Sequence, residues 1–285
     1  MCQTGSTPIV DARKRRLLSK VEFSPEEERA YRWLLSNYRD ALTPVEQSIS
    51  EWLSSVDETR LSSLSGIEAS IHDRIGVFAS DFEVVFSEGG QRGAAAGRAM
   101  AARQFGLDVD FDVVPERTLD EIDDWVSVAS ESTMETISQD SAQWLRGAHE
   151  EGLDMDSITD RMNDELFEGW LEDHVAERAA RTATIGTSNA GTHSAIEDSS
   201  AIAEEWLTSL DGRERETHAD ANGQIVPVGR TFLVGGEELA HPGDPSGPLE
   251  ETIQCRCTVM PRWPDDLDED ERAAIEAGQR LYAST

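Results

Sequence analysis

The sequence predicts an α+β protein: a mostly helical N-terminal part followed by a small mixed α/β C-terminal domain with short antiparallel strands. Two observations lead to this class. Up to about residue 200, apolar residues recur at helical spacing behind helix-start signals. From Trp206 onward, glycine and proline become frequent and short β-prone pieces appear. The 285 residues are enough for one large domain or two ordinary ones.

Changes in composition divide the chain into four expected regions. These are a basic N-terminal arm (1–20), a helical domain (21–200), a C-terminal domain (201–263) and an acidic tail (264–285). The one basic cluster, residues 13–16, lies in the arm, and we interpret it as a solvated segment in preference to a DNA contact. The tail is expected to be an appendage with a short helical pattern.

Two similar helix-start signals open the helical domain. Residues 24–27 combine a capping serine, a proline at the first helical position and a glutamate at the third. Residues 43–46 repeat this pattern with threonine, proline and glutamate. We therefore expect two consecutive helices with a tight junction between them.

The rest of the helical domain gives mixed secondary-structure signals. Residues 82–86 fit a short strand or a helix end, and residues 109–114 alternate as in a strand. The glycine-rich run 89–97 is not a phosphate loop, because no Gly-Lys-Ser/Thr follows it, and it indicates a hinge or a close helix approach. A long helix is expected to open at Thr118. Another, over 170–190, carries small residues on one face, which favours a close neighbour.

Three β-prone pieces follow in the C-terminal domain. They cover 225–228, 231–234 and 258–260. Gly229-Arg230 separates the first two, so we expect a hairpin turn there.

The net charge of −32 at pH 7 restricts the function classes. Charge of this size repels itself in dilute salt, whereas molar salt shortens the Debye length to about 3 Å. Lys14 and Lys20 are the only lysines, and this pattern suggests a halophilic source; the alternative is an ordinary acidic protein. The acidic balance also argues against nonspecific nucleic-acid binding.

The three cysteines, Cys2, Cys255 and Cys257, do not make a disulfide framework. The sequence therefore predicts a protein made in a reducing cytoplasm. No apolar run of spanning length occurs in it, so a membrane is not an expected partner.

The closely spaced cysteines offer chemistry together with His218. Two sulfurs and an imidazole are a candidate zinc site. Alternatively, Cys255 and Cys257 occupy next-nearest positions of a strand and pack as two small buried side chains. A cysteine nucleophile with His218 or His241 as its base is a further option. Carboxylate pairs carry no information in so acidic a chain.

Many less common residue types follow one another in a recognisable order. They are Trp206, Asp211, Arg215, His218, Gly223, Phe232, Pro242-Gly243-Asp244-Pro245, Glu251 and Cys255-Arg256-Cys257. This order resembles the C-terminal domain of the phage Mu F-like head morphogenesis family, which comprises minor head proteins of tailed viruses. Upstream, residues 180–182 and Asn189 resemble the preceding helix motif of that family. Ala183 and Gln254 depart from the pattern, which has Glu and Asn at those places.

The resemblance implies structural roles, and no catalytic residue is expected. The motif residues that it marks are Arg181, Asn189, Trp206, Asp211, Arg215, His218, Pro242, Asp244, Cys255, Arg256 and Cys257. Among them, His218, Cys255 and Cys257 are the candidate metal ligands, with zinc as the metal. No other cofactor is expected.

The resemblance also implies a place in a virus particle. Such a protein lies inside the head near the portal vertex, in several copies, and in the host cytoplasm during assembly. The portal protein is the expected partner, with the major capsid protein and packaged DNA as further candidates. The expected function is head morphogenesis, genome packaging or delivery in a virus of a halophilic host. The alternative is an enzyme or toxin-type effector that uses the His/Cys cluster.

Overall fold

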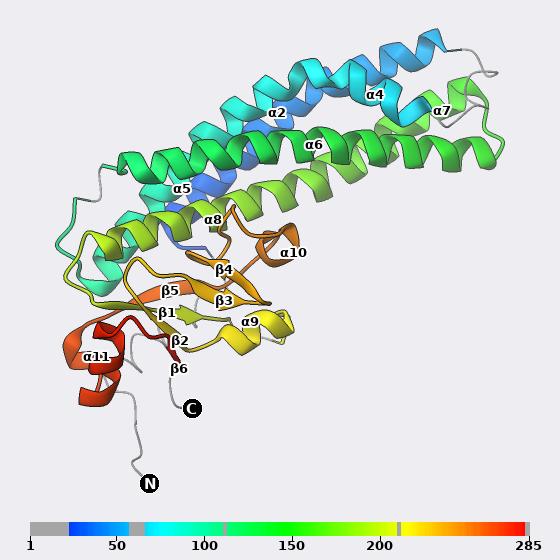
Figure 1. Cartoon of the computed structure of the whole chain (residues 1–285). Helices are drawn as coiled ribbons and strands as arrows, with labels where there is room; N and C mark the ends of the chain where they lie inside the picture. The colour runs from blue at the N-terminus through cyan, green and yellow to red at the C-terminus, as the bar shows by residue number, and fades with distance from the viewer. Residues whose placement is uncertain (1–22, 57–65, 111–112, 210–211, 283–285) are drawn as a thin grey trace. The chain divides into compact units, whose positions relative to one another are not determined.

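The computed structural model describes residues 23–56, 66–110, 113–209 and 212–282 (Figure 1). Helices make up the N-terminal part, and the strands belong to the C-terminal third, coloured yellow to red. This arrangement confirms the predicted α+β class. The expected basic arm, together with Cys2 and Asp211, lies outside the described residues. No helix in the described ranges is long and apolar enough to span a membrane.

The described residues form two compact units. Unit 1 takes its residues from 1–31, 90–122 and 181–285, and unit 2 from 32–89 and 123–180. The four linear regions expected from the sequence remain a prediction. The two compact units do not follow the linear order of those regions, because unit 1 combines the C-terminal strands with helical residues far away in the sequence.

The helical segments of the described residues follow one another along the chain. They are α2 (Pro25–Ser55), α4 (Ile67–Ile75), the 3₁₀ turn η2 (Gly76–Phe78), α5 (Ala79–Phe105), α6 (Glu116–Glu150), α7 (Met155–Arg161), the π-helical segment η3 (Met162–Val175) and α8 (Ala176–Glu197). The helix expected to open at Thr118 is confirmed as α6, two residues earlier. The described residues of 109–114 form no strand, so that prediction is wrong.

The expected break at Pro44 is also wrong, because α2 runs through it. Pro44 has no N–H to donate to the carbonyl four residues earlier, which usually costs about 3 kcal/mol in a helix interior. Apolar residues on both sides of it share one buried face: Leu42, Val45 and Ile49 are fully buried. Their burial outweighs the lost hydrogen bond.

The run 82–86 lies near the start of α5, so it is neither a strand nor the end of a helix, and both readings of that segment are wrong. In unit 2, the ring of Tyr38 packs edge-on against Phe82 at 5.0 Å, and Phe86 packs against Trp125 at 5.2 Å. The glycine run of α5 marks a close helix approach, as one of its two readings proposed. In unit 1, a Cβ on Gly97 would lie 1.9 Å from the carbonyl oxygen of Ser188 in α8.

The strands of unit 1 form two antiparallel sheets. The larger has the order β5-β1-β2-β6 and the smaller pairs β3 with β4. The strands are β1 (Ala203–Leu207), β2 (Gln224–Pro227), β3 (Phe232–Val234), β4 (Glu237–Leu239), β5 (Thr258–Arg262) and β6 (Leu281–Tyr282). Between and after them lie α9 (Glu216–Ala221), α10 (Leu249–Thr252), the 3₁₀ turn η4 (Pro264–Asp266) and α11 (Glu269–Glu276).

A turn forms at Gly229-Arg230, but it does not join a hairpin. The Arg230 N–H donates to the Pro227 carbonyl at 3.0 Å, and Gly229 has a φ of 77°. However, β2 pairs with β1 and β6, whereas β3 pairs with β4. The hairpin prediction is therefore wrong, because partners distant in the sequence take both edges of β2.

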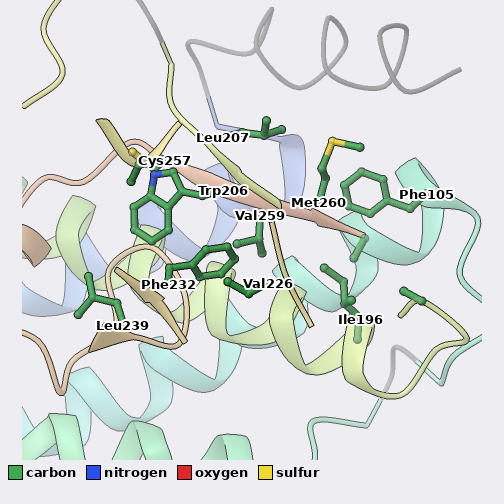
Figure 2. Close-up of a cluster of buried hydrophobic side chains, with 14 of the residues drawn as sticks. Phe105, Ile196, Trp206, Leu207, Val226, Phe232, Leu239, Cys257, Val259 and Met260 are labelled. Atoms are coloured by element: carbon green, nitrogen blue, oxygen red, sulfur yellow. The ribbon is translucent and has the colours of Figure 1, made fainter. Parts of the chain in front are cut away.

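A buried apolar cluster holds unit 1 together (Figure 2). Trp206 is fully buried in it, with its ring packed edge-on against Phe232 at 5.4 Å. Val226 and Val259 join it from the neighbouring strands, and Cys257 lies on the side of Trp206. The sheet thus places the cysteine segment next to the core.

The acidic tail is part of unit 1 and not an appendage. Leu267 and Ile275 are buried against Ala203 and Ile225 of the sheet. The last strand, β6, pairs with β2. The apolar side of the tail therefore packs on the sheet, and its helix α11 ends at Glu276.

Candidate functional site

The side chains of His218, Cys255 and Cys257 converge in unit 1. The Nδ1 atom of His218 lies 3.2 Å from Cys257 Sγ and 3.7 Å from Cys255 Sγ. The three donor atoms lie within 4.8 Å of one another, and all three residues are buried. The structure therefore brings together the three residues that the sequence proposed as metal ligands.

Both cysteines lie in the segment just before β5. They precede β5 in the chain and are not positions of that strand, as one reading of the sequence supposed. Gln254 has a φ of 51°, which is uncommon for a residue other than glycine. Its N–H donates to Thr182 Oγ1 at 3.1 Å, so α8 holds the backbone just before Cys255.

The segment that carries His218 is tied to the cysteine loop. Arg215, at the N-terminus of α9, donates through Nη2 to the Ile253 carbonyl at 2.5 Å. On the opposite side of the histidine, the hydroxyl of Thr208 donates to the His218 carbonyl at 2.8 Å. The backbone of His218 is therefore fixed from two directions.

A carboxylate faces the other ring nitrogen of the histidine. Nε2 of His218 lies 2.9 Å from Glu251 Oε2, an ion-pair contact. The same oxygen accepts a hydrogen bond from the Thr217 hydroxyl at 2.8 Å. Glu251 is itself largely buried. The imidazole thus lies between two sulfurs and one carboxylate.

The thiols and the imidazole influence one another electrostatically. A hydrogen bond with Cys255, against the opposing effect of burial, and the nearby His218 lower the pKa of Cys257 to about 5. The same hydrogen bond, together with burial, raises the pKa of Cys255 well above its ordinary value. Burial acts to lower the pKa of His218, but contact with Cys257 raises it overall. Negative charge is therefore favoured on Cys257 and positive charge on His218.

Burial limits what this group can do chemically. Cys255 is 1% exposed, His218 2% and Cys257 4%, so the described structure leaves no open approach for a substrate to a nucleophilic sulfur. His241, the other base considered, binds elsewhere: its Nε2 lies 2.5 Å from Glu121 Oε1. Two sulfurs and one imidazole nitrogen are a donor set that suits a metal ion.

A second buried polar cluster lies between α8, β1 and the loop after β4. Nδ1 of His193 lies 2.8 Å from Glu204 Oε2, and its Nε2 lies 3.6 Å from Glu197. The ring of His241 lies 5.8 Å from that of His193. Glu204 raises the pKa of His193 to about 9, although burial alone would lower it. These paired charges fasten the helical part of unit 1 to its sheet.

Three other motif residues, Asn189, Pro242 and Asp244, hold loops together. The Nδ2 group of buried Asn189 donates to the carbonyl oxygens of Pro242 and Cys257, both at 3.0 Å. Asp244 accepts from the Ala240 N–H at 2.6 Å and from the Ser246 N–H at 2.8 Å, which closes the turn that follows Pro242. Asn189 therefore links α8 to that turn and to the cysteine segment.

The remaining motif residues have more varied surroundings. Trp206 packs edge-on against the His218 ring at 5.8 Å. The guanidinium of Arg181 lies over the Phe23 ring at 5.0 Å. Arg256 is half-buried, and Asp211 lies outside the described residues.

Reasoning from the sequence missed some of the residues that support the site. Thr208 and Thr217 carry no motif signal. Glu204, which is fully buried, looked like one more surface acid. The sequence did carry a signal for Glu204. It stands in the mostly apolar run 201–207, where the neighbouring residues predict burial.

Comparisons with known proteins agree with the motif in part of the chain. Residues 141–260 match the family model described as "Phage Mu protein F like protein". This range contains all eleven motif residues and covers less than half of the chain. It supports the resemblance drawn from the motif.

The chain is also similar to a curated protein. It is the "NAD(+)--arginine ADP-ribosyltransferase EFV" of Enterococcus faecalis (strain ATCC 700802 / V583), 25% identical over 152 residues. The match covers 45% of this chain and 31% of the enzyme, so the chain spans about a third of the relative's length. No solved structure matches the chain.

Proposed function

We propose that this protein is a minor head protein of a tailed virus, acting in head morphogenesis, genome packaging or delivery. The observation that carries the proposal is the match of residues 141–260 to the Phage Mu F-like model. By this proposal the protein lies inside the head near the portal vertex, in several copies. Its expected partner is the portal protein, and the major capsid protein and packaged DNA are further candidates.

The geometry of the motif supports a structural role. Asn189, His218 and both cysteines are buried and engaged with one another or with nearby backbone. A catalytic group has to reach a substrate, whereas a group that stabilises loops does not. The motif residues of unit 1 are therefore suited to holding that unit in shape for assembly.

The composition of purified particles tests the proposal. We expect peptides of this chain in virions at low copy number, and co-purification with the portal ring from disrupted heads. A chain with Asn189→Asp and Trp206→Ala, which disturbs the motif, should be depleted from particles relative to one carrying Glu276→Ala at an exposed site. Particles that lack the protein, with abundant protein in uninfected cells, would contradict it.

The acid-rich composition supports a halophilic host within this proposal. Aspartate and glutamate number 57 against 25 lysines and arginines. An excess of this size is best tolerated where salt screens the repulsion between the side chains.

A second candidate function rests on the similarity to the ADP-ribosyltransferase. Under this reading the chain transfers ADP-ribose from NAD⁺ to arginine. Incubation with labelled NAD⁺ and an arginine-rich protein tests it directly, with heat-inactivated chain as the control. We expect no transfer of label, because the chain spans only 31% of that enzyme. Label transfer that is lost in a His218→Ala variant with intact fold would favour the enzyme reading.

A further inference from the structure

We propose that His218, Cys255 and Cys257 bind one Zn²⁺ ion, which fastens α9 to the segment before β5. This site goes beyond the virion assignment and does not depend on it. Three features of unit 1 support the site: the spacing of the donor atoms, the carboxylate behind the histidine and the backbone that presents the sulfurs.

The spacing of the donor atoms fits three of the four positions around a tetrahedral ion. Zinc bonds of about 2.3 Å to sulfur and about 2.05 Å to nitrogen place an N···S pair roughly 3.6 Å apart at the tetrahedral angle. The two observed N···S distances are 3.2 and 3.7 Å, on either side of that value. Each N···S distance therefore lies within about 0.4 Å of the value expected around the ion.

A carboxylate lies beside the ring nitrogen of His218 that faces away from the sulfurs. When one ring nitrogen binds a metal, the other usually donates to a carboxylate, which fixes the ring and raises its basicity. Here Nδ1 faces both sulfurs, while Nε2 lies 2.9 Å from Glu251 Oε2. The Thr217 hydroxyl in turn holds that oxygen at 2.8 Å. The Nε2–Glu251 contact is an ion pair without hydrogen-bond geometry, so Glu251 acts on the ring through its charge.

The backbone around the two cysteines is held in place by the protein itself. Gln254 takes a left-handed conformation, with a φ of 51°, immediately before the first cysteine. The Cys257 carbonyl is held by Asn189 at 3.0 Å. Strain and anchoring of this kind persist where the surrounding structure fixes a functional geometry.

The donor set selects zinc among common divalent ions. Thiolates are soft ligands, and a tetrahedral set of sulfur and nitrogen is typical of zinc, whereas magnesium and calcium take oxygen. Because the ligands come from α9 and from the loop before β5, the ion would close a loop of about forty residues in the fold. Its loss should loosen unit 1.

Metal analysis of the full chain tests the site. Protein purified under reducing conditions, without added metal, should contain about one zinc per chain. Replacement by Co²⁺ should give the intense near-ultraviolet absorption of thiolate–cobalt bonds. Treatment of the unaltered chain with a chelator should lower its melting temperature, and added Zn²⁺ should restore it.

Variants separate the site from general effects on folding. Cys255→Ser, Cys257→Ser and His218→Ala should each lose the bound zinc. Cys2→Ser, which alters the third cysteine, should keep it. Glu251→Gln keeps all three ligands, so it should retain the ion but bind it about 10- to 100-fold more weakly in competition with a chelator.

The measurements on the unaltered chain decide the outcome even if the ligand variants do not fold. Zinc at about one equivalent, with a melting temperature that depends on it, supports the site. A folded chain with no retained zinc, no thiolate–cobalt absorption and no response to chelator overturns it. So does a Cys255–Cys257 disulfide, detected by mass after purification under reducing conditions.

Discussion

At the scale of single residues, glycine marks where two backbones touch in unit 1. A Cβ on Gly97 would lie 1.9 Å from the Ser188 carbonyl oxygen, and one on Gly191 would lie 2.0 Å from the Ala94 carbonyl oxygen. Neither clash involves the flexible end of a side chain, so the helices themselves would have to separate. The small residues of α5 and α8 are therefore needed for packing.

Gly97→Ala should destabilise the protein by about 3 kcal/mol, because overpacking at a backbone contact cannot relax locally. The control is Gly147→Ala in α6, where a Cβ meets nothing within 4 Å. There, the higher helix propensity of alanine should stabilise by about 0.5–1 kcal/mol. Urea denaturation of both variants measures the difference. Equal effects of the two substitutions would mean that α5 and α8 do not approach closely.

The His193–Glu204 pair makes stability depend on pH. The pKa of His193 in the folded state is about 9, above the ordinary value of 6.5. Between pH 6.5 and 9 the folded state therefore holds a proton that the unfolded state has lost. The stabilisation is complete below pH 6.5 and is lost as the pH rises through about 9. For this nearly buried histidine the whole effect amounts to about 3 kcal/mol.

His193→Gln should remove this part of the pH dependence. We expect the free energy of unfolding of the unaltered chain to fall more steeply from pH 6.5 to 9 than that of the variant. Urea denaturation at several pH values measures both slopes. His174→Gln, at an exposed position of unit 2, is the matched control and should keep the slope of the unaltered chain. Identical slopes for all three chains would contradict the assignment.

At the scale of elements, the C-terminal tail shows how packing decides structure. Its acidic composition suggested an appendage, yet α11 places Ile275 into a buried cluster with Leu267 and Ile225. Two capping interactions define its start, since Asp268 accepts from the Glu271 N–H at 2.8 Å and Glu271 accepts from the Asp268 N–H at 3.0 Å. The acids at the start of the helix are therefore caps as well as solvated charges.

Ile275→Ala should cost about 2–4 kcal/mol, because it removes buried methyl groups and leaves a cavity. Glu276→Ala, at the next and exposed position, should change stability by less than about 0.5 kcal/mol. Thermal or urea denaturation separates the two results. If both variants were as stable as the unaltered chain, the tail would not contribute to the core of unit 1.

At the scale of the whole molecule, the net charge of −32 opposes the compact state. Exposed charges further apart than the Debye length are largely screened, and that length falls from about 10 Å at 0.1 M salt to about 3 Å at 1 M. Salt should therefore stabilise the folded chain more than it stabilises an ordinary protein.

We expect the melting temperature to rise steadily as KCl is increased from 0.1 to about 2 M. Sucrose at constant ionic strength is the control, because it favours compact states without screening charge. A rise with salt well above the rise with sucrose supports the electrostatic reading. A melting temperature that does not change with KCl would contradict it.

Local signals were predictable where local chemistry decides the structure. The serine cap at Ser24 was read correctly, and its hydroxyl accepts from the Glu27 N–H at 3.2 Å. Strand β1 was missed because Glu204 and Glu205 give it a charged character. Both acids are fully buried, paired with His193 and Arg262 at 2.8 and 2.6 Å. Only partners distant in the sequence allow that strand to lie in a core.

The sequence by itself determined the α+β class, the charge and the order of the motif residues, since these depend on composition, capping and spacing. Only the tertiary structure decided that Pro44 lies inside a helix and that the tail joins the sheet. It also decided that His218 lies against both cysteines with Glu251 behind it. The physical reason is burial. Contacts between distant segments remove apolar surface from water, and pairing offsets the cost of burying charges with it. That gain outweighs the local preferences that a sequence pattern can express.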